Sequence, residues 1–305
     1  MIPRISIARA LVLVAAALAM LAAIPLTVFA QSLPAPAATP TQAFAVERIG
    51  RGRPMILIPG LLSGGEVWKS TVERYKDRYD MHVLTLAGFA GVPPLAGETF
   101  LAAERDAIIR YIREQRLDKP VIVGHSLGGF LAFWIAAAAP EIVGPIVAVD
   151  GVPFLPALND STMTPEKATP RAQQFRSMAA SFTPEQLATQ NAMFMRSRAK
   201  DSVHVPMAAR WGRASDGATM GRAVAEMMTT DLRAELANIR TPVLLIAAGD
   251  GLTAEQQHAV RAVYESQVSR IARHRVVLAS NARHFVMLDD PAFLFSAMDD
   301  FLEGR

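Results

Sequence analysis

Cysteine is absent from this chain of 305 residues. Its absence excludes disulfide bonds, thiolate metal sites, a cysteine nucleophile and the modified cysteine of a lipoprotein. The sequence also lacks internal repeats and any run of Lys and Arg interleaved with aromatic residues. Because the formal net charge is only +3, a nucleic-acid partner is not expected.

Apolar residues are plentiful and charges are sparse, with 51% hydrophobic and 19% charged residues. This composition provides enough material for a packed core and differs from that of disordered proteins. The length permits one large α/β domain or two smaller ones.

The N-terminus has the pattern of an export signal. Two arginines precede the apolar stretch 10–24, and small side chains follow it at Val28 and Ala30. We expect residues 1–30 to be a signal peptide, cleaved between Ala30 and Gln31. The alternative is an uncleaved membrane anchor, because the apolar stretch approaches spanning length.

Residues 31–44 are rich in proline and alanine, and we interpret them as a linker without a fold of its own. Signal cleavage would place the mature protein in the periplasm or outside the cell. The mature chain would then have no stable membrane span.

After the linker, strand-like apolar runs alternate with amphipathic helices. This alternation predicts an α/β protein with a mostly parallel, doubly wound sheet covered on both faces. Strands are expected at 54–59, 81–86, 119–124, 145–149, 242–247 and 275–279, and helices at 101–116, 127–139 and 291–302.

The alternation fails over residues 152–237, which are rich in proline and methionine. We interpret this segment as a helical cap inserted into a core formed by residues 45–151 and 238–305. Its methionines either pack the helices or form a pliable apolar wall around a ligand, since thioethers adapt to irregular shapes.

The strongest chemical signal is Gly124-His125-Ser126-Leu127-Gly128, between an expected strand and an expected helix. This is the G-x-S-x-G nucleophile elbow, in which a tight turn presents the serine hydroxyl above the sheet. Larger side chains at Gly124 and Gly128 would collide, and the helix N-terminus favours developing negative charge. Ser126 is therefore the candidate nucleophile.

A serine hydroxyl needs a base to take its proton, and the chain has six histidines. His284 follows the last expected strand after a short loop and precedes the closing helix, so it can reach the elbow across the sheet edge. The other histidines lie within strands, helices, the expected cap or the elbow itself: His82, His125, His204, His258 and His274. His284 is the candidate base.

Two aspartates compete for the acid that orients the imidazole. Asp250 follows the expected strand 242–247, and Asp150 follows the expected strand 145–149. Both lie at carboxyl ends of strands and give the chain order Ser, Asp, His. We favour Asp250 and keep Asp150 as the alternative.

An oxyanion hole requires two N–H donors. One is expected from Leu127, directly after the nucleophile, and the other from Leu61, after the turn at Gly60. No Lys-Ser/Thr follows the glycines of this loop, and G-x-G-x-x-G spacing is missing, so phosphate and dinucleotide sites are disfavoured. The sequence implies no organic cofactor and no metal.

These motifs together resemble enzymes of the α/β-hydrolase fold that carry a helical cap. The resemblance covers residues 45–302, and its most specific parts are Gly124 to Gly129, Leu57 to Gly60, and Arg283 to Phe285. The segment Arg240 to Ile246 is similar to the family's lead-in to the acid-bearing strand. The resemblance implies a triad of Ser126, Asp250 and His284, with Leu61 and Leu127 as the oxyanion pair.

Two departures from the family pattern stand out. Pro59-Gly60 replaces the usual His-Gly, and the acid loop is about one residue shorter than the commonest form, which keeps Asp150 in contention. Relatives that attack with aspartate are disfavoured because the elbow residue is serine.

The leading functional hypothesis is a serine hydrolase that cleaves an ester or related acyl bond through an acyl-enzyme. Its substrate is expected to be a small, apolar acyl compound. Amide, lactone or β-lactam hydrolysis and acyl transfer are the alternatives on the same triad. A catalytically inactive binding protein on the hydrolase fold is the alternative from another class.

Overall fold

A single seven-stranded sheet forms the centre of the protein, in the computed structural model that describes residues 43–304. The expected signal peptide and most of the expected linker lie outside the described residues. Within the described range, no helix is long and apolar enough to cross a membrane. The strands are β1 (Phe44–Gly50), β2 (Arg53–Ile58), β3 (Tyr79–Leu86), β4 (Val121–His125), β5 (Ile146–Val149), β6 (Val243–Ala248) and β7 (His274–Ala279).

The strand order is β1-β3-β2-β4-β5-β6-β7, and every pairing except that of β1 with β3 is parallel. The mostly parallel sheet predicted from the sequence is therefore confirmed. The inner strands are almost continuously apolar and buried because helices cover both faces. Strand β1 was not expected, since most of its side chains are polar or partly exposed at the edge of the sheet.

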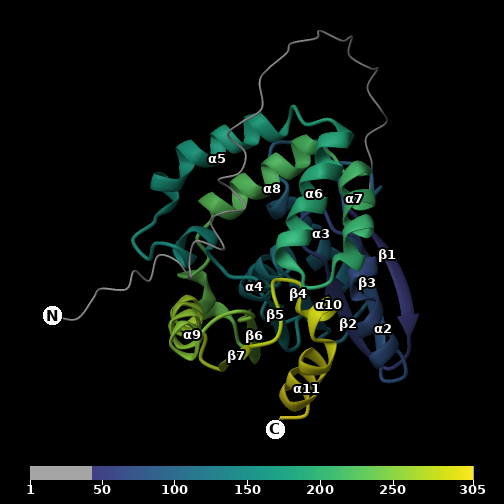
Figure 1. Cartoon of the computed structure of the whole chain (residues 1–305). Coiled ribbons are helices and arrows are strands. Elements are labelled where there is room, and N and C mark those ends of the chain that lie inside the picture. The colour runs from purple at the N-terminus through teal and green to yellow at the C-terminus, as the bar shows by residue number, and fades with distance from the viewer. Residues whose placement is uncertain (1–42, 305) are drawn as a thin grey trace, which may run out of the picture.

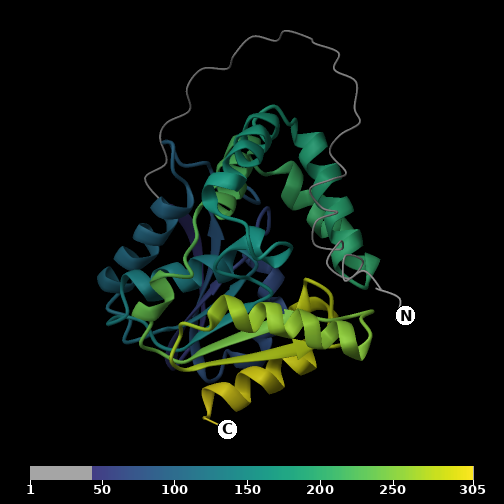
Figure 2. The ribbon, with the colours of Figure 1, turned by 90° about the vertical axis from the view of Figure 1, so that its left-hand side faces the viewer.

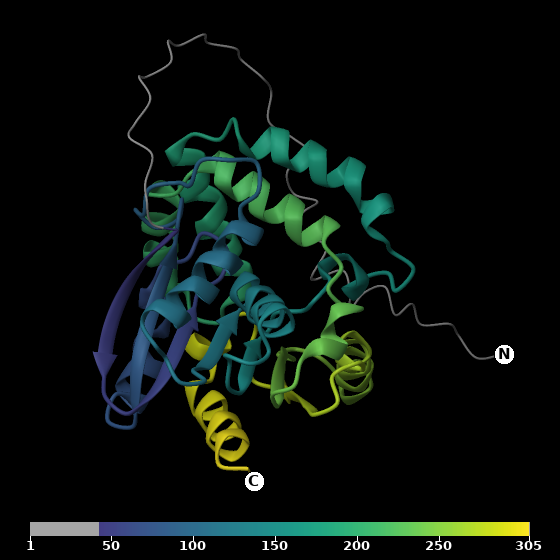
Figure 3. The same cartoon turned by 180° about the vertical axis from the view of Figure 1, so that it is seen from behind.

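Helices pack on the two faces of the sheet over separate apolar clusters (Figures 1 and 3). One face is covered by α3 (Leu101–Glu114), α4 (Leu127–Ala138) and α9 (Ala254–Val268). The other is covered by α2 (Lys69–Tyr75), the short α10 (Val286–Asp289) and α11 (Pro291–Leu302). Helix α4 is apolar on nearly all sides because it is buried between the sheet and α3.

Four longer helices lie between β5 and β6, and we call them the insertion. They pack as two pairs, α5 with α8 and α6 with α7, above the carboxyl edge of the sheet (Figures 1 and 2). Their bounds are α5 (Pro165–Ala179), α6 (Pro184–Arg198), α7 (Val205–Arg213) and α8 (Gly217–Thr229).

Prolines start several of these helices. Pro165 and Pro184 each occupy the first helical position, where a missing N–H costs nothing. Thr183 adds a capping box with Gln186 ahead of α6. Short 3-10 turns at Leu155–Leu158, Ser202–His204 and Glu235–Asn238 complete the segment between β5 and β6, as one at Gly65–Trp68 precedes α2.

Side-chain hydrogen bonds attach the insertion to the loops of the sheet. Asn191 of α6 donates to the carbonyl of Leu62 at 3.2 Å. The carboxylate of Glu226 in α8 accepts N–H groups at the start of α3, including that of Leu101 at 2.9 Å. This carboxylate caps the positive end of α3, so both helix pairs are bonded to the core.

The methionines of the insertion are mostly packing residues. Four are buried within the apolar clusters, namely Met195, Met220, Met227 and Met228. Met193 is 48% exposed on the outer surface of α6. Of the two interpretations of the methionines, helix packing accounts for the buried ones without any ligand.

Candidate active site

Ser126 occupies the turn between β4 and α4 in a backbone conformation that few non-glycine residues adopt. Its φ is 53° and its ψ is −113°. Such a conformation costs of the order of 1–3 kcal/mol and persists only where the surroundings enforce it. The N–H of Ser126 donates to Val149 at 2.9 Å, and its carbonyl accepts from Phe130 at 3.0 Å. The turn is therefore held from the neighbouring strand and from its own helix.

The glycines around this turn are required by close backbone contacts. A methyl group on Gly124 would lie 2.1 Å from the carbonyl oxygen of Gly128. One on Gly128 would lie 2.2 Å from that of Ile58, and one on Gly151 would lie 2.3 Å from that of Ser126. Any side chain at these positions would force strand and helix apart.

His284 pairs with Asp150, which follows β5. The imidazole Nδ1 lies 2.6 Å from Asp150 Oδ2. Since a carboxylate accepts, Nδ1 carries the proton and Nε2 is left as the basic nitrogen. The side chains are 16% and 9% exposed, respectively, so the pair is mostly shielded from water.

Two further donors hold the Asp150 carboxylate. The Tyr264 hydroxyl of α9 donates to Oδ1 at 2.7 Å, and the Ala248 N–H at the end of β6 donates to the same oxygen at 3.1 Å. Burial alone would raise the pKa of Asp150, but the hydrogen bonds from His284, Tyr264 and Ala248 lower it below its usual value. Asp150 therefore remains an anion beside the imidazole.

The preference for Asp250 as the orienting acid is corrected by this arrangement. Asp250 forms ion pairs with Lys200 at 3.1 Å and with Arg283 at 3.2 Å instead. Its N–H bonds to the carbonyl of Ala282, which places it in the loop beside these cations. The hydrogen bonds of Lys200 and Arg283 outweigh a partial burial and lower the pKa of Asp250.

His125 forms a hydrogen bond to the backbone of the candidate base. Its Nε2 donates to the carbonyl oxygen of His284 at 3.0 Å, and the two imidazole rings lie 4.6 Å apart. Burial, with a smaller contribution from the charge of His284, lowers the pKa of His125 to about 3. His125 is thus a neutral donor that positions the backbone of His284.

This neutral histidine predicts an acid-sensitive contribution to stability. The folded-state pKa lies below the ordinary 6.5, so the unfolded chain binds a proton first as the pH falls. The stabilisation that comes from keeping His125 neutral in the folded state is fully present above pH 6.5 and is lost progressively as the pH falls toward 3. We expect the unfolding free energy of the wild type to fall more steeply over this range than that of His125→Gln, by up to about 1.4 kcal/mol per pH unit. Denaturant titrations at several pH values measure this, and parallel curves would contradict it.

Two backbone N–H groups are available next to Ser126. The turn after β2 approaches closely, because a methyl group on Gly60 would lie 3.3 Å from Ser126 Cβ. Within the described residues, neither Leu61 nor Leu127 donates its N–H to another protein group. Both N–H groups therefore remain available to a ligand oxygen.

Two aromatic residues contribute contacts that the sequence did not indicate. Tyr264 reaches Asp150 from a helix 114 residues later in the chain. Phe194 of α6 packs its ring nearly perpendicular to the His284 ring, with centroids 5.6 Å apart. Both contacts are made across the fold, so neither had a local signal in the sequence.

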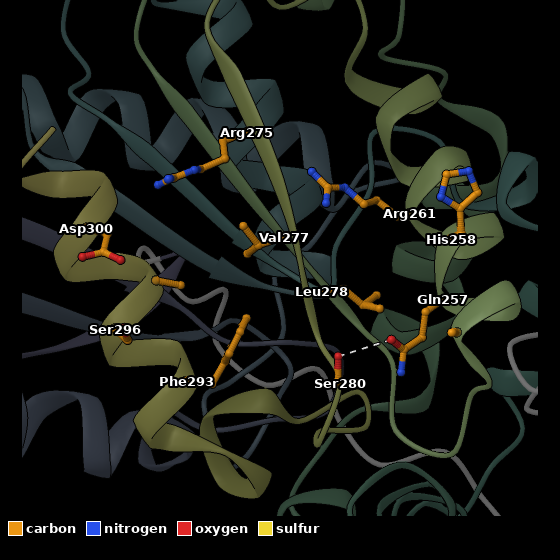
Figure 4. A pocket seen from close by; sticks show the side chains of 12 residues that line it. Gln257, His258, Arg261, Arg275, Val277, Leu278, Ser280, Phe293, Ser296 and Asp300 are labelled. Atoms are coloured by element: carbon orange, nitrogen blue, oxygen red, sulfur yellow. Dashed lines mark hydrogen bonds between the residues drawn. The ribbon is translucent and has the colours of Figure 1, made fainter. Parts of the chain in front are cut away.

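A separate hollow of about 480 Å³ lies between α9, β7 and α11 (Figure 4). Its lining is mixed, and includes Gln257, Arg261 and Phe293. Ser126, His284 and Asp150 do not line it. The hollow therefore does not contribute to the candidate site.

Comparisons with known proteins agree with the elbow and the sheet. Residues 55–297 match the model of the alpha/beta hydrolase family. A pimeloyl-[acyl-carrier protein] methyl ester esterase from Aeromonas hydrophila is 33% identical over 121 residues, which is 38% of this chain and 44% of that protein. The esterase of the same name from Nitrosomonas europaea is 25% identical over 83% of this chain and 97% of its own length.

Solved structures show the same fold. A hydrolase from Pseudomonas aeruginosa superposes with a TM-score of 0.70 at 19% identity, covering 85% of this chain and 94% of its own. An enol-lactonase from Burkholderia xenovorans superposes with a TM-score of 0.67 at 15% identity, covering 85% and 96%. Since the family model spans most of the residues that form the sheet and the site, the protein belongs to the alpha/beta hydrolase family.

Proposed function

We propose that the protein is a serine esterase in which Ser126, His284 and Asp150 form the catalytic triad. The observation that carries this proposal is the 2.6 Å contact between His284 and Asp150 on the same sheet edge as the strained Ser126 turn. Nucleophile, base and orienting acid then follow three strands of one parallel sheet. The esterase names of the relatives support the same reaction class.

The proposed reaction has two halves. Ser126 Oγ bonds to the carbonyl carbon of the ester while its proton passes to His284 Nε2. The negative charge that forms on the carbonyl oxygen is stabilised by the N–H groups of Leu61 and Leu127. The alcohol leaves with the proton from His284, and water then releases the acid from Ser126 by the same steps.

Asp150 acts through the imidazole. Its charge stabilises the imidazolium that forms when His284 takes the proton, and its position holds the ring with Nε2 directed at the reaction. Because three donors lower the pKa of Asp150, it stays ionised throughout the neutral range.

The insertion is proposed to cap this site. Its α6 helix contributes Phe194, which contacts the His284 ring, and Asn191, which bonds to the loop that carries Leu61. Substrate would therefore bind between α6 and the carboxyl edge of the sheet. The methyl esterase names of the relatives favour an ester of a small alcohol.

Labelling with a fluorophosphonate tests the proposal directly. We expect the folded protein to be modified at Ser126 and Ser126→Ala to remain unmodified, because only an activated serine reacts. A panel of esters, amides, lactones and β-lactams should show fastest turnover with the esters. Folded wild type that is not labelled would favour a binding protein on this fold, and faster turnover of another class would replace the esterase assignment.

A further inference from the structure

Arg198, the last residue of α6, lies beside the candidate base. Its carbonyl accepts from the N–H of Phe285 at 3.4 Å, which attaches the end of α6 to the segment that carries His284. Its guanidinium lies 5.8 Å from the centroid of Phe194, the ring that also packs on His284. Phe194 thus contacts both the cation and the imidazole.

The Arg198 side chain lacks a polar partner. Among the described residues, its guanidinium forms neither an ion pair nor a hydrogen bond with protein. The other partly buried arginines of residues 152–237 are all bonded: Arg176 to Glu98, Arg222 to carbonyl oxygens of the 95–97 loop, and Arg233 to Asp231. Arg171 and Arg196 are exposed and need no protein partner.

Arg198 is partly buried at this position. Burial lowers its pKa, and the nearby Asp150 and Tyr264 oppose this only in part. The carboxylate of Asp150 is already engaged by His284, Tyr264 and Ala248. A guanidinium offers five N–H donors in a planar fork that matches a carboxylate. The Arg198 nitrogens are not among the fully buried atoms, so a ligand carboxylate can reach them.

We propose that Arg198 binds a free carboxylate on the substrate, so that the preferred esters are half-esters of dicarboxylic acids. This inference rests on the proposed esterase function and specifies its substrate class. It replaces the apolar acyl substrate expected from the sequence by a chain with an apolar middle and an anionic end. Phe194 then supplies apolar contact between the two ends.

The test compares two matched substrate series. Monomethyl esters of linear dicarboxylic acids are compared with methyl esters of monocarboxylic acids of equal chain length, and kcat/KM is measured for each. We expect wild type to prefer the half-esters at one chain length. Arg198→Gln should lower kcat/KM for that half-ester by about 10- to 100-fold and change the neutral ester by less than about threefold. Arg198→Lys should fall between, since it keeps the charge but loses the fork.

The matched control is Arg196→Gln, on the same helix but exposed, which should leave both series unchanged. Equal losses on both series with Arg198→Gln would overturn the proposal and assign Arg198 to support of Asp150. A wild type that favours the neutral esters would overturn it as well. Fluorophosphonate labelling separates these failures from failure of the esterase proposal: labelled Ser126 with turnover of neutral esters preserves the esterase, whereas loss of both removes the two proposals together.

Discussion

Ser126→Ala and His284→Ala are each expected to lower kcat for ester hydrolysis by several orders of magnitude, with about 10⁶ as the value for a comparable triad. Without the hydroxyl there is no acyl-enzyme, and without the imidazole the hydroxyl keeps its proton. The two residues act on one proton, so the double variant should be little slower than either single variant. Single-turnover kinetics with a chromogenic ester measure all three.

Controls for this experiment come from the same chain. Ser280→Ala and His258→Ala change the same residue types at the hollow of Figure 4, away from the site, and should retain turnover. Additive losses in the double variant would mean that Ser126 and His284 do not share a proton transfer. Circular dichroism of each variant shows whether the fold is retained.

Asp150→Asn should reduce turnover by about 10⁴ near neutral pH, as the corresponding change does in a serine protease triad. The amide preserves shape but removes the charge that stabilises the imidazolium, and it can donate to Nδ1 and so stabilise the wrong tautomer. Asp250→Asn should lower turnover by less than about tenfold. Its ion pairs with Lys200 and Arg283 are partly exposed, and such pairs contribute about 0–1 kcal/mol to stability.

The comparison of these two variants is decisive because they make the same chemical change on adjacent strands. A large loss with Asp250→Asn and a small one with Asp150→Asn would return the orienting role to the later strand.

Local patterns were sufficient to predict the sheet and the position of the Ser126 turn between β4 and α4. The inner strands read as buried apolar runs, and Ser126 lies in a five-residue turn whose glycine pattern is visible in the sequence, although Gly128 contacts the distant Ile58. The same patterns could not choose between Asp150 and Asp250. Both follow strands at the same edge, and the choice depends on Tyr264 and Lys200, which approach from distant helices or loops.

Strand β1 and the state of Arg198 could not be predicted from the sequence, for a related reason. Strand β1 has an edge pattern that is only partly apolar, so its pairing with β3 had no periodic signal. Arg198 is one of several arginines in residues 152–237, and only the tertiary arrangement shows that its guanidinium lacks an acceptor. Side-chain partners across the fold, rather than secondary structure, limited the prediction of the site.

The hydrogen bonds of the Glu226 carboxylate limit how the insertion can move relative to the core. Because this carboxylate caps the first N–H groups of α3, raising α8 as a rigid lid would fray a helix of the core. Lifting α6 would in turn break the bond from Asn191 to Leu62 and that from Phe285 to Arg198. Both helix pairs of the insertion are therefore bonded to the core, and we expect substrate exchange at the proposed site to use rotations of side chains such as Phe194 rather than a hinged opening.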